Sequence, residues 1–285
     1  MNHQEGFFQG VRNTNIYYQC WLPEDPPRAV IVIVHGLNEH SGRYMNLVAH
    51  VVPQGYAVYA FDHPGHGKSE GVRAHVERFN DFTDTLDIYT AMVCGWQPEN
   101  PIFLLGHSLG GLICAVYLLE HQERFTGAIL SAPAVNIAGD ISPLMIFLGK
   151  LLSVVLPAFG LTRQLSDGVS RDPEVVKAYI HDPLVTYPGK VTARLGAEIF
   201  NAMQRIRAEA GAIALPILLV QGSADRLVDP AGAQMLYEKA GSPDKTLHVY
   251  KGLYHEIMNE PEREQVLEDI ATWLATHRVA MRGGT

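Results

Sequence analysis

The strongest constraint on the fold of this 285-residue chain is Ala29–Val34, six consecutive apolar residues, most of them β-branched. A strand without a polar side chain must be covered on both faces, which is typical of a parallel sheet between layers of helices. The pair His35-Gly36 then marks a turn. We therefore predict a strand in the middle of a sheet that is buried on both sides.

Strand-like and helix-like segments alternate along much of the chain. Further strands are predicted at Tyr56–Phe61, Ile102–Leu105, Gly127–Ser131, Ile217–Gln221 and Lys245–Tyr250, and helices at Tyr44–Val52, Phe79–Trp96, Leu109–Glu120, Pro230–Ala240 and Pro261–His277. Such alternation favours right-handed βαβ units and a mostly parallel central sheet with helices on both faces. Before it, Glu5–Val11 and Thr14–Leu22 predict a hairpin of antiparallel strands.

The alternation stops between Ala134 and Ala210, where the sequence is apolar and helical with Gly and Pro interruptions. We interpret residues 134–210 as an inserted helical lid on a core formed by 1–133 and 211–285. The lid includes the very apolar stretch Ile141–Leu161. Lys150 near its middle and Pro157 near its end argue against a membrane-spanning helix.

Composition excludes several classes of protein. Hydrophobic residues make up 47% and charged residues 18% of the chain, as in ordinary globular proteins. A net charge of −8 without Lys/Arg runs argues against nucleic acid as a partner. The cysteines Cys20, Cys94 and Cys114 form no CxxC pair, and the first residues lack the features of a secretory signal, so we expect a reducing compartment, the cytoplasm. The sequence does not indicate an oligomeric state.

The segment Gly106-His107-Ser108-Leu109-Gly110 matches the pattern G-x-S-x-G and lies between a predicted strand and a predicted helix. In that context the serine occupies a strained turn, and the glycines avoid collisions with neighbouring backbone. We therefore predict that Ser108 is a nucleophile. The backbone N–H of Leu109, at the start of the helix, is one expected oxyanion donor, and that of Leu37, after the Ala29–Val34 strand, is the second.

An acid and a base are expected later in the chain, in the order Ser, Asp, His. Asp225 follows the predicted strand Ile217–Gln221, whereas Asp229 directly precedes Pro230 and is better placed to cap the next helix. His255 follows the last predicted strand and is the expected general base. This chemistry needs no cofactor and no metal. The segment His255-Glu256-Ile257-Met258-Asn259 lacks the second histidine of an H-E-x-x-H zinc motif.

Nearly the whole chain resembles the monoacylglycerol lipases and their lysophospholipase-like bacterial relatives, which have the α/β-hydrolase fold. The resemblance lies in the motifs His35–Tyr44, Phe61–Ser69, Gly106–Gly111, Asp182-Pro183-Leu184 and Gly222–Arg226. It implies that Glu39, Arg43 and Tyr179 bind the polar end of the substrate. An alternative for Glu39 and Arg43 is a salt bridge that holds the oxyanion loop. Met258 occupies a position where some members have a second histidine near the glycerol.

The resemblance implies hydrolysis of monoacylglycerols to fatty acid and glycerol through an acyl-enzyme on Ser108. The alternatives are a lysophospholipase or broad-specificity carboxylesterase, and, from a different class, a non-catalytic lipid-binding hydrolase fold. The apolar residues of Ile141–Leu161 are more numerous than one helix face can bury. They are expected to line an acyl tunnel, to touch a membrane peripherally, or to pack on the core, and these interpretations stay open.

Overall fold

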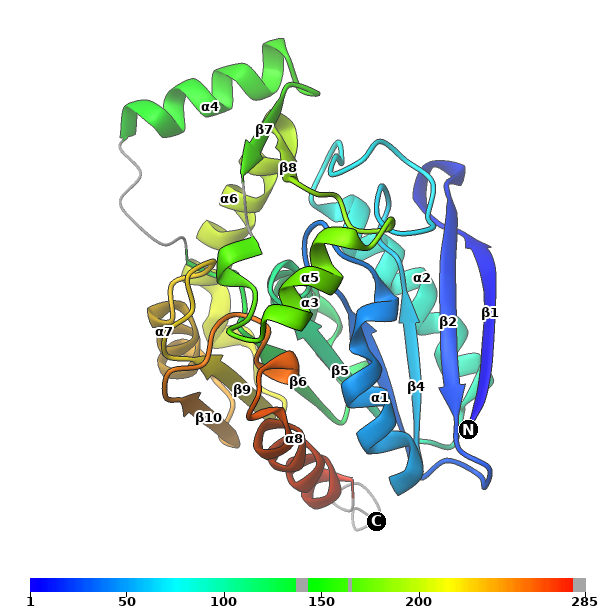
Figure 1. Cartoon of the computed structure of the whole chain (residues 1–285). Helices are drawn as coiled ribbons and strands as arrows, with labels where there is room; N and C mark the ends of the chain where they lie inside the picture. The colour runs from blue at the N-terminus through cyan, green and yellow to red at the C-terminus, as the bar shows by residue number, and fades with distance from the viewer. Residues whose placement is uncertain (137–142, 164–165, 279–285) are drawn as a thin grey trace.

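The computed structural model describes residues 1–136, 143–163 and 166–278. Its main sheet has eight strands in the order β1-β2-β4-β3-β5-β6-β9-β10 (Figure 1). The strands are β1 (Asn2–Gln9), β2 (Asn15–Leu22), β3 (Ala29–Val34), β4 (Tyr56–Phe61), β5 (Ile102–His107), β6 (Gly127–Ser131), β9 (Ile217–Gly222) and β10 (Lys245–Tyr250). The predicted strands are confirmed, and the largest difference is in β1, which begins at Asn2 instead of Glu5.

All strand pairs from β4 to β10 are parallel. The pairs β1–β2 and β2–β4 are antiparallel. Val34 at the end of β3 pairs with Phe61 on one side and with Gly106 on the other. The strand order reverses at β3, because β4 and β5 lie on opposite sides of it. The loops that leave β3 and β5 therefore open a crevice at the carboxyl edge of the sheet, where ligands bind in folds of this kind.

Helices cover both faces of the sheet, as predicted (Figure 1). The helices of the core are α1 (Met45–Val51), α2 (Asn80–Trp96), α3 (Leu109–His121), α7 (Ala231–Lys239) and α8 (Arg263–His277). All six residues of β3 are completely buried. Val30, Val32 and Val34 pack with α2 and α3, whereas the alternate residues pack with α1 and α8. The apolar run thus supplies both layers of the core, since successive strand side chains point to opposite faces.

The segment between β6 and β9 contains α4 (Pro143–Val155), β7 (Gly160–Arg163), α5 (Pro173–His181), β8 (Gly189–Thr192) and α6 (Ala193–Glu209). The strands β7 and β8 form a separate antiparallel pair in which Gly160 lies opposite Thr192. Only helices were predicted for this segment. Each strand is four residues long, too short for an alternating pattern to distinguish it from a loop.

Helix α4 lies away from the sheet, beyond α6 (Figure 1). Many of its described apolar side chains face outward: Leu148, Leu151, Val154 and Val155 are each more than half exposed, and Leu156 follows them. The start of the predicted stretch Ile141–Leu161 lies outside the described residues. Within the described part of the chain, no helix is both long enough and apolar enough to cross a membrane.

Candidate active site

Ser108 lies in a strained turn between β5 and α3. Its φ is 54° and its ψ is −118°, a backbone conformation that costs a non-glycine residue of order 1–3 kcal/mol. The two glycines of the motif let the turn pack closely. A Cβ on Gly106 would lie 2.4 Å from the carbonyl oxygen of Gly110, and a Cβ on Gly110 would lie 1.9 Å from that of Val34. The turn therefore holds the start of α3 directly against the ends of β3 and β5.

Two backbone amides lie beside Ser108. Leu109 is the first residue of α3, so its N–H has no acceptor within the helix. Leu37 belongs to the loop after β3, in which a Cβ on Gly36 would lie 3.2 Å from the Cβ of Ser108. Among the described residues, none accepts a hydrogen bond from either amide. Both expected oxyanion donors are thus unpaired and border the same cavity as Ser108.

Asp225 and His255 form a buried hydrogen-bonded pair. The Nδ1 of His255 donates to Oδ2 of Asp225 over 2.8 Å, and the Nε2 amide of Gln221 donates to the same oxygen over 3.0 Å. The other carboxylate oxygen accepts from the N–H groups of Leu227 and Val228 over 2.8 and 3.1 Å. The side chain of Asp225 is completely buried, and these four donors stabilise its charge.

Burial opposes the charged form of both members of this pair, but their mutual attraction outweighs it. Burial raises the pKa of Asp225, but the charge of His255 and the hydrogen bonds to the carboxylate together lower it by more. The net pKa of Asp225 therefore lies below its usual value. For His255 burial lowers the pKa, but the charge of Asp225 and the hydrogen bond raise it above the ordinary value. With Nδ1 engaged as a donor, Nε2 of His255 is left as the proton acceptor.

A cavity of about 260 Å³ has Ser108 and His255 in its wall. One part of the wall is apolar, and its larger side chains are Val169, Val191, Ile199, Met203, Leu227 and Val228. The polar residues of the wall, besides Ser108 and His255, are Glu39, His107, Asn136, Tyr179 and Glu256. Several of these residues belong to the segment between β6 and β9. The cavity therefore suits a ligand with one apolar and one polar end.

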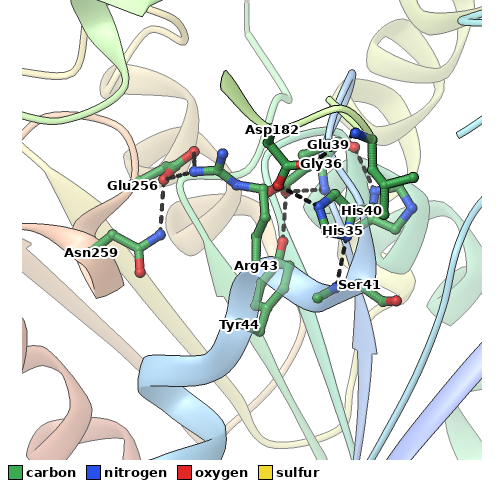
Figure 2. Close-up of polar contacts among 12 residues, drawn as sticks. His35, Gly36, Glu39, His40, Ser41, Arg43, Tyr44, Asp182, Glu256 and Asn259 are labelled. Carbon is green, nitrogen blue, oxygen red and sulfur yellow. Dashed lines mark hydrogen bonds and ion pairs between the residues drawn. The ribbon is translucent and has the colours of Figure 1, made fainter. Parts of the chain in front are cut away.

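Arg43 is the centre of a polar cluster that it forms with Glu39, Tyr179 and Glu256 (Figure 2). Its Nη2 donates to both carboxylate oxygens of Glu256, over 2.9 and 2.7 Å. Its Nε lies 3.4 Å from Oε2 of Glu39, and its guanidinium lies over the ring of Tyr179, 4.6 Å from the centroid. Burial lowers the pKa of Arg43, but the two carboxylates outweigh that effect and raise it. The guanidinium is therefore held in its charged form.

Glu39 connects this cluster to the oxyanion loop. Its Oε1 accepts hydrogen bonds from the N–H of Gly36 over 2.5 Å and from the hydroxyl of Tyr44 over 2.8 Å (Figure 2). Burial and then the charge of Glu256 raise the pKa of Glu39. Glu39 and Tyr179 border the cavity, whereas Arg43 lies behind them and does not. Of the three residues expected to bind substrate, the structure thus places two on the cavity wall.

His35 shapes the loop after β3 from within the core. It is completely buried, its Nδ1 donates to the carbonyl of Gly36 over 2.7 Å, and its Nε2 accepts from the N–H of His63 over 2.9 Å. Burial lowers its pKa well below the usual value, so the ring is neutral. Across residues 1–136, 143–163 and 166–278, no group of three or more His, Cys, Asp or Glu side chains is placed to hold a metal ion.

Glu256 is a site residue that was not predicted from the sequence. It borders the cavity directly after His255, and Oε2 also accepts from Nδ2 of Asn259 over 2.8 Å. Its only sequence signal is that adjacency, because its partner Arg43 is more than two hundred residues away. Asp229 caps the start of α7, as expected, by accepting from the N–H of Ala231 over 2.9 Å.

Comparisons with known proteins identify similar hydrolases. Residues 25–262 match the family model described as serine aminopeptidase, S33. The chain is 38% identical to the monoacylglycerol lipase of Mycolicibacterium smegmatis, over 96% of this chain and 97% of that one. It is 40% identical to the monoglyceride lipase of Rattus norvegicus, over 94% of this chain and 89% of that one.

The fold also matches solved structures. The crystal structure of Paleococcus ferrophilus monoacylglycerol lipase superimposes with a TM-score of 0.81 at 35% sequence identity and covers 97% of this chain and 100% of its own. The prediction of an α/β-hydrolase fold is confirmed. With a strained serine, a buried Asp–His pair and relatives matched over nearly their full length, this chain belongs to the monoacylglycerol lipase-like family of α/β-hydrolases.

Proposed function

We propose that this protein is a serine ester hydrolase that cleaves monoacylglycerols to free fatty acid and glycerol. The observation that carries the proposal is one cavity that combines Ser108 in its strained turn, the Asp225–His255 pair, an apolar wall and a polar cluster. The names of the curated relatives support the same substrate.

In the proposed mechanism, Nε2 of His255 takes the proton from the Ser108 hydroxyl while Oγ attacks the ester carbonyl carbon. The amides of Leu37 and Leu109 donate to the oxyanion of the tetrahedral intermediate. His255 then gives its proton to the departing glycerol oxygen, which leaves an acyl-enzyme. Water, deprotonated by His255, attacks the acyl carbon; His255 then returns this proton to Oγ of Ser108 as the acyl–oxygen bond breaks and the fatty acid leaves. Asp225 stabilises the imidazolium in both steps. No cofactor is required.

The arrangement of the cavity suggests how the substrate lies. We place the glycerol hydroxyls against Glu39, Tyr179 and Glu256, with Arg43 positioning these side chains from behind. The acyl chain lies along the apolar wall, to which α6 contributes Ile199 and Met203. Residues 134–210 then act as a lid over a core formed by 1–133 and 211–285.

We further propose that the exposed apolar side chains of α4 contact a lipid surface. Leu151, Val154 and Val155 are 51%, 69% and 64% exposed. Apolar area on one helix of this kind is typical of peripheral membrane contact. A cytoplasmic enzyme with such a lid would take its single-chain substrate from the membrane surface.

A second candidate activity is that of a lysophospholipase or broad-specificity carboxylesterase. Met258 borders a small hollow behind the polar cluster together with Arg43 and Asn259, and this apolar residue offers the head group no hydrogen bond. The chain is also 34% identical to a relative named phospholipase YtpA from Bacillus subtilis. A non-catalytic lipid-binding role is disfavoured because Ser108, Asp225 and His255 are all present.

The test compares monooleoylglycerol, oleoyl-lysophosphatidylcholine and nitrophenyl butyrate as substrates of the purified protein. We expect the highest kcat/KM with monooleoylglycerol. Ser108→Ala should abolish hydrolysis and labelling by a fluorophosphonate, whereas Ser153→Ala, the same change in α4 away from the cavity, should leave both intact. Labelling of Ser108→Ala would refute the assigned nucleophile. Cleavage of nitrophenyl butyrate without any cleavage of monooleoylglycerol would refute the assigned substrate.

A further inference from the structure

The polar end of the cavity carries two carboxylates and no positive charge of its own. Among the described residues that border the cavity, Glu39 and Glu256 are acidic and none is Lys or Arg. The cation Arg43 lies behind this wall and is paired with both carboxylates. Its charge is therefore already compensated by the protein and does not attract an anion into the cavity.

We infer that Glu256 sets the head-group specificity of this enzyme, by admitting uncharged polyol esters and rejecting lysolipids whose head group carries phosphate. The inference rests on the proposed function, because it places the head group at this end of the cavity. It also separates the proposed substrate from the phosphate-bearing substrates of the alternative activity.

Hydrogen-bond chemistry and charge act in the same direction. A carboxylate offers only acceptors, so it pairs well with the hydroxyl donors of glycerol. A phosphate group also offers acceptors and is negatively charged. Its oxygens would therefore meet the carboxylate oxygens of Glu39 and Glu256 without a donor between them, and the negative charges would repel each other. Glu256 is only 6% exposed, and solvent therefore screens this repulsion less than it would at the surface.

Glu256 is a better candidate for this role than Glu39. Glu39 holds the N–H of Gly36 in the oxyanion loop, so its removal would disturb catalysis on every substrate. The described hydrogen-bond partners of the Glu256 side chain are Arg43 and Asn259, and neither of them borders the main cavity. Glu256→Gln keeps the side-chain volume, leaves Arg43 paired with Glu39 and adds an amide donor that a phosphate can accept.

The experiment compares 1-oleoylglycerol with 1-oleoylglycerol 3-phosphate, which share the scissile ester and differ only in the phosphate. Both are presented in the same neutral detergent micelles. The wild-type protein should favour the neutral ester by at least tenfold in kcat/KM, and Glu256→Gln should shift this ratio towards the phosphate ester by about tenfold. A merely structural role of Glu256 would lower both rates and leave the ratio unchanged, and that result would overturn the inference.

The control is Glu262→Gln, which removes a carboxylate from an ion pair with Arg171 on the same C-terminal segment but away from the cavity. It should leave the ratio at the wild-type value. An equal shift in this control would also overturn the inference, because the effect would then reflect net charge alone.

A measurement on the wild-type protein needs no variant. Glycerol should inhibit hydrolysis of nitrophenyl butyrate at a concentration at least tenfold lower than glycerol 3-phosphate does. Equal or stronger inhibition by the phosphate would contradict the inference. If the protein cleaves nitrophenyl butyrate but not 1-oleoylglycerol, the proposed function fails, and this inhibition still decides whether the cavity rejects anions.

Discussion

Replacing Gly110 by alanine should lower both the stability and the activity of this protein. A Cβ at this position would lie 1.9 Å from the carbonyl oxygen of Val34 and 2.5 Å from that of His35. Both oxygens belong to the backbone, so no side chain can rotate away. Helix α3 and strand β3 must instead move apart by roughly 1 Å, a displacement that costs about 100-fold in rate when it occurs between reacting groups.

The expected loss of folding free energy is about 2 kcal/mol, typical of overpacking in a dense core. For a domain of this size that corresponds to a fall in Tm of roughly 3–4 °C. The movement also separates the loop carrying the Leu37 amide from the turn carrying Ser108. We therefore expect kcat on nitrophenyl butyrate to fall about 100-fold at a temperature where the variant is still folded.

Thermal unfolding followed by circular dichroism, together with esterase kinetics, tests both effects. The matched control is Gly149→Ala in α4, where an added Cβ meets nothing within 4 Å. That change should leave kcat unaltered and stabilise the helix by up to about 1 kcal/mol. If Gly110→Ala unfolds at the wild-type temperature and keeps the wild-type kcat, the close packing of the turn does not have the role described.

Three further perturbations test the charged groups of the site: a change of pH, Asp225→Asn and Arg43→Leu. Because the pKa of His255 is raised above its ordinary value and catalysis needs the neutral ring, kcat/KM should fall as the pH drops through a value above 6.5. Asp225→Asn should lower kcat by about 10⁴-fold and move this acid limb to lower pH, and an unmoved limb would contradict the pairing. Arg43→Leu leaves two buried carboxylates uncompensated and should cost about 3–5 kcal/mol in chemical denaturation. Arg205→Leu, which breaks more exposed ion pairs, should cost less than about 1 kcal/mol, and equal costs would refute the role of burial.

Local sequence patterns were sufficient to predict the core of the fold. The strand Ala29–Val34 was predicted with its observed ends, because six apolar residues between turn signals have no exposed face to occupy. The glycines around Ser108 similarly fixed the turn, since their steric reason is local. The short strands β7 and β8 were missed, because their pairing depends on contacts made within the folded segment and not on a pattern in either strand.

The order of Ser108, Asp225 and His255 along the chain was readable from the sequence, and so was the α/β-hydrolase fold that accounts for it. Only the tertiary structure decided that Arg43 lies behind the cavity wall and that Glu256 takes the place at its polar end. Strand and turn propensities depend on residues that are close in sequence, and they can therefore be recognised in the sequence itself. The pairing of Arg43 with Glu256 joins residues from distant parts of the chain, and its energy depends on burial and distance, which exist only after the chain has folded.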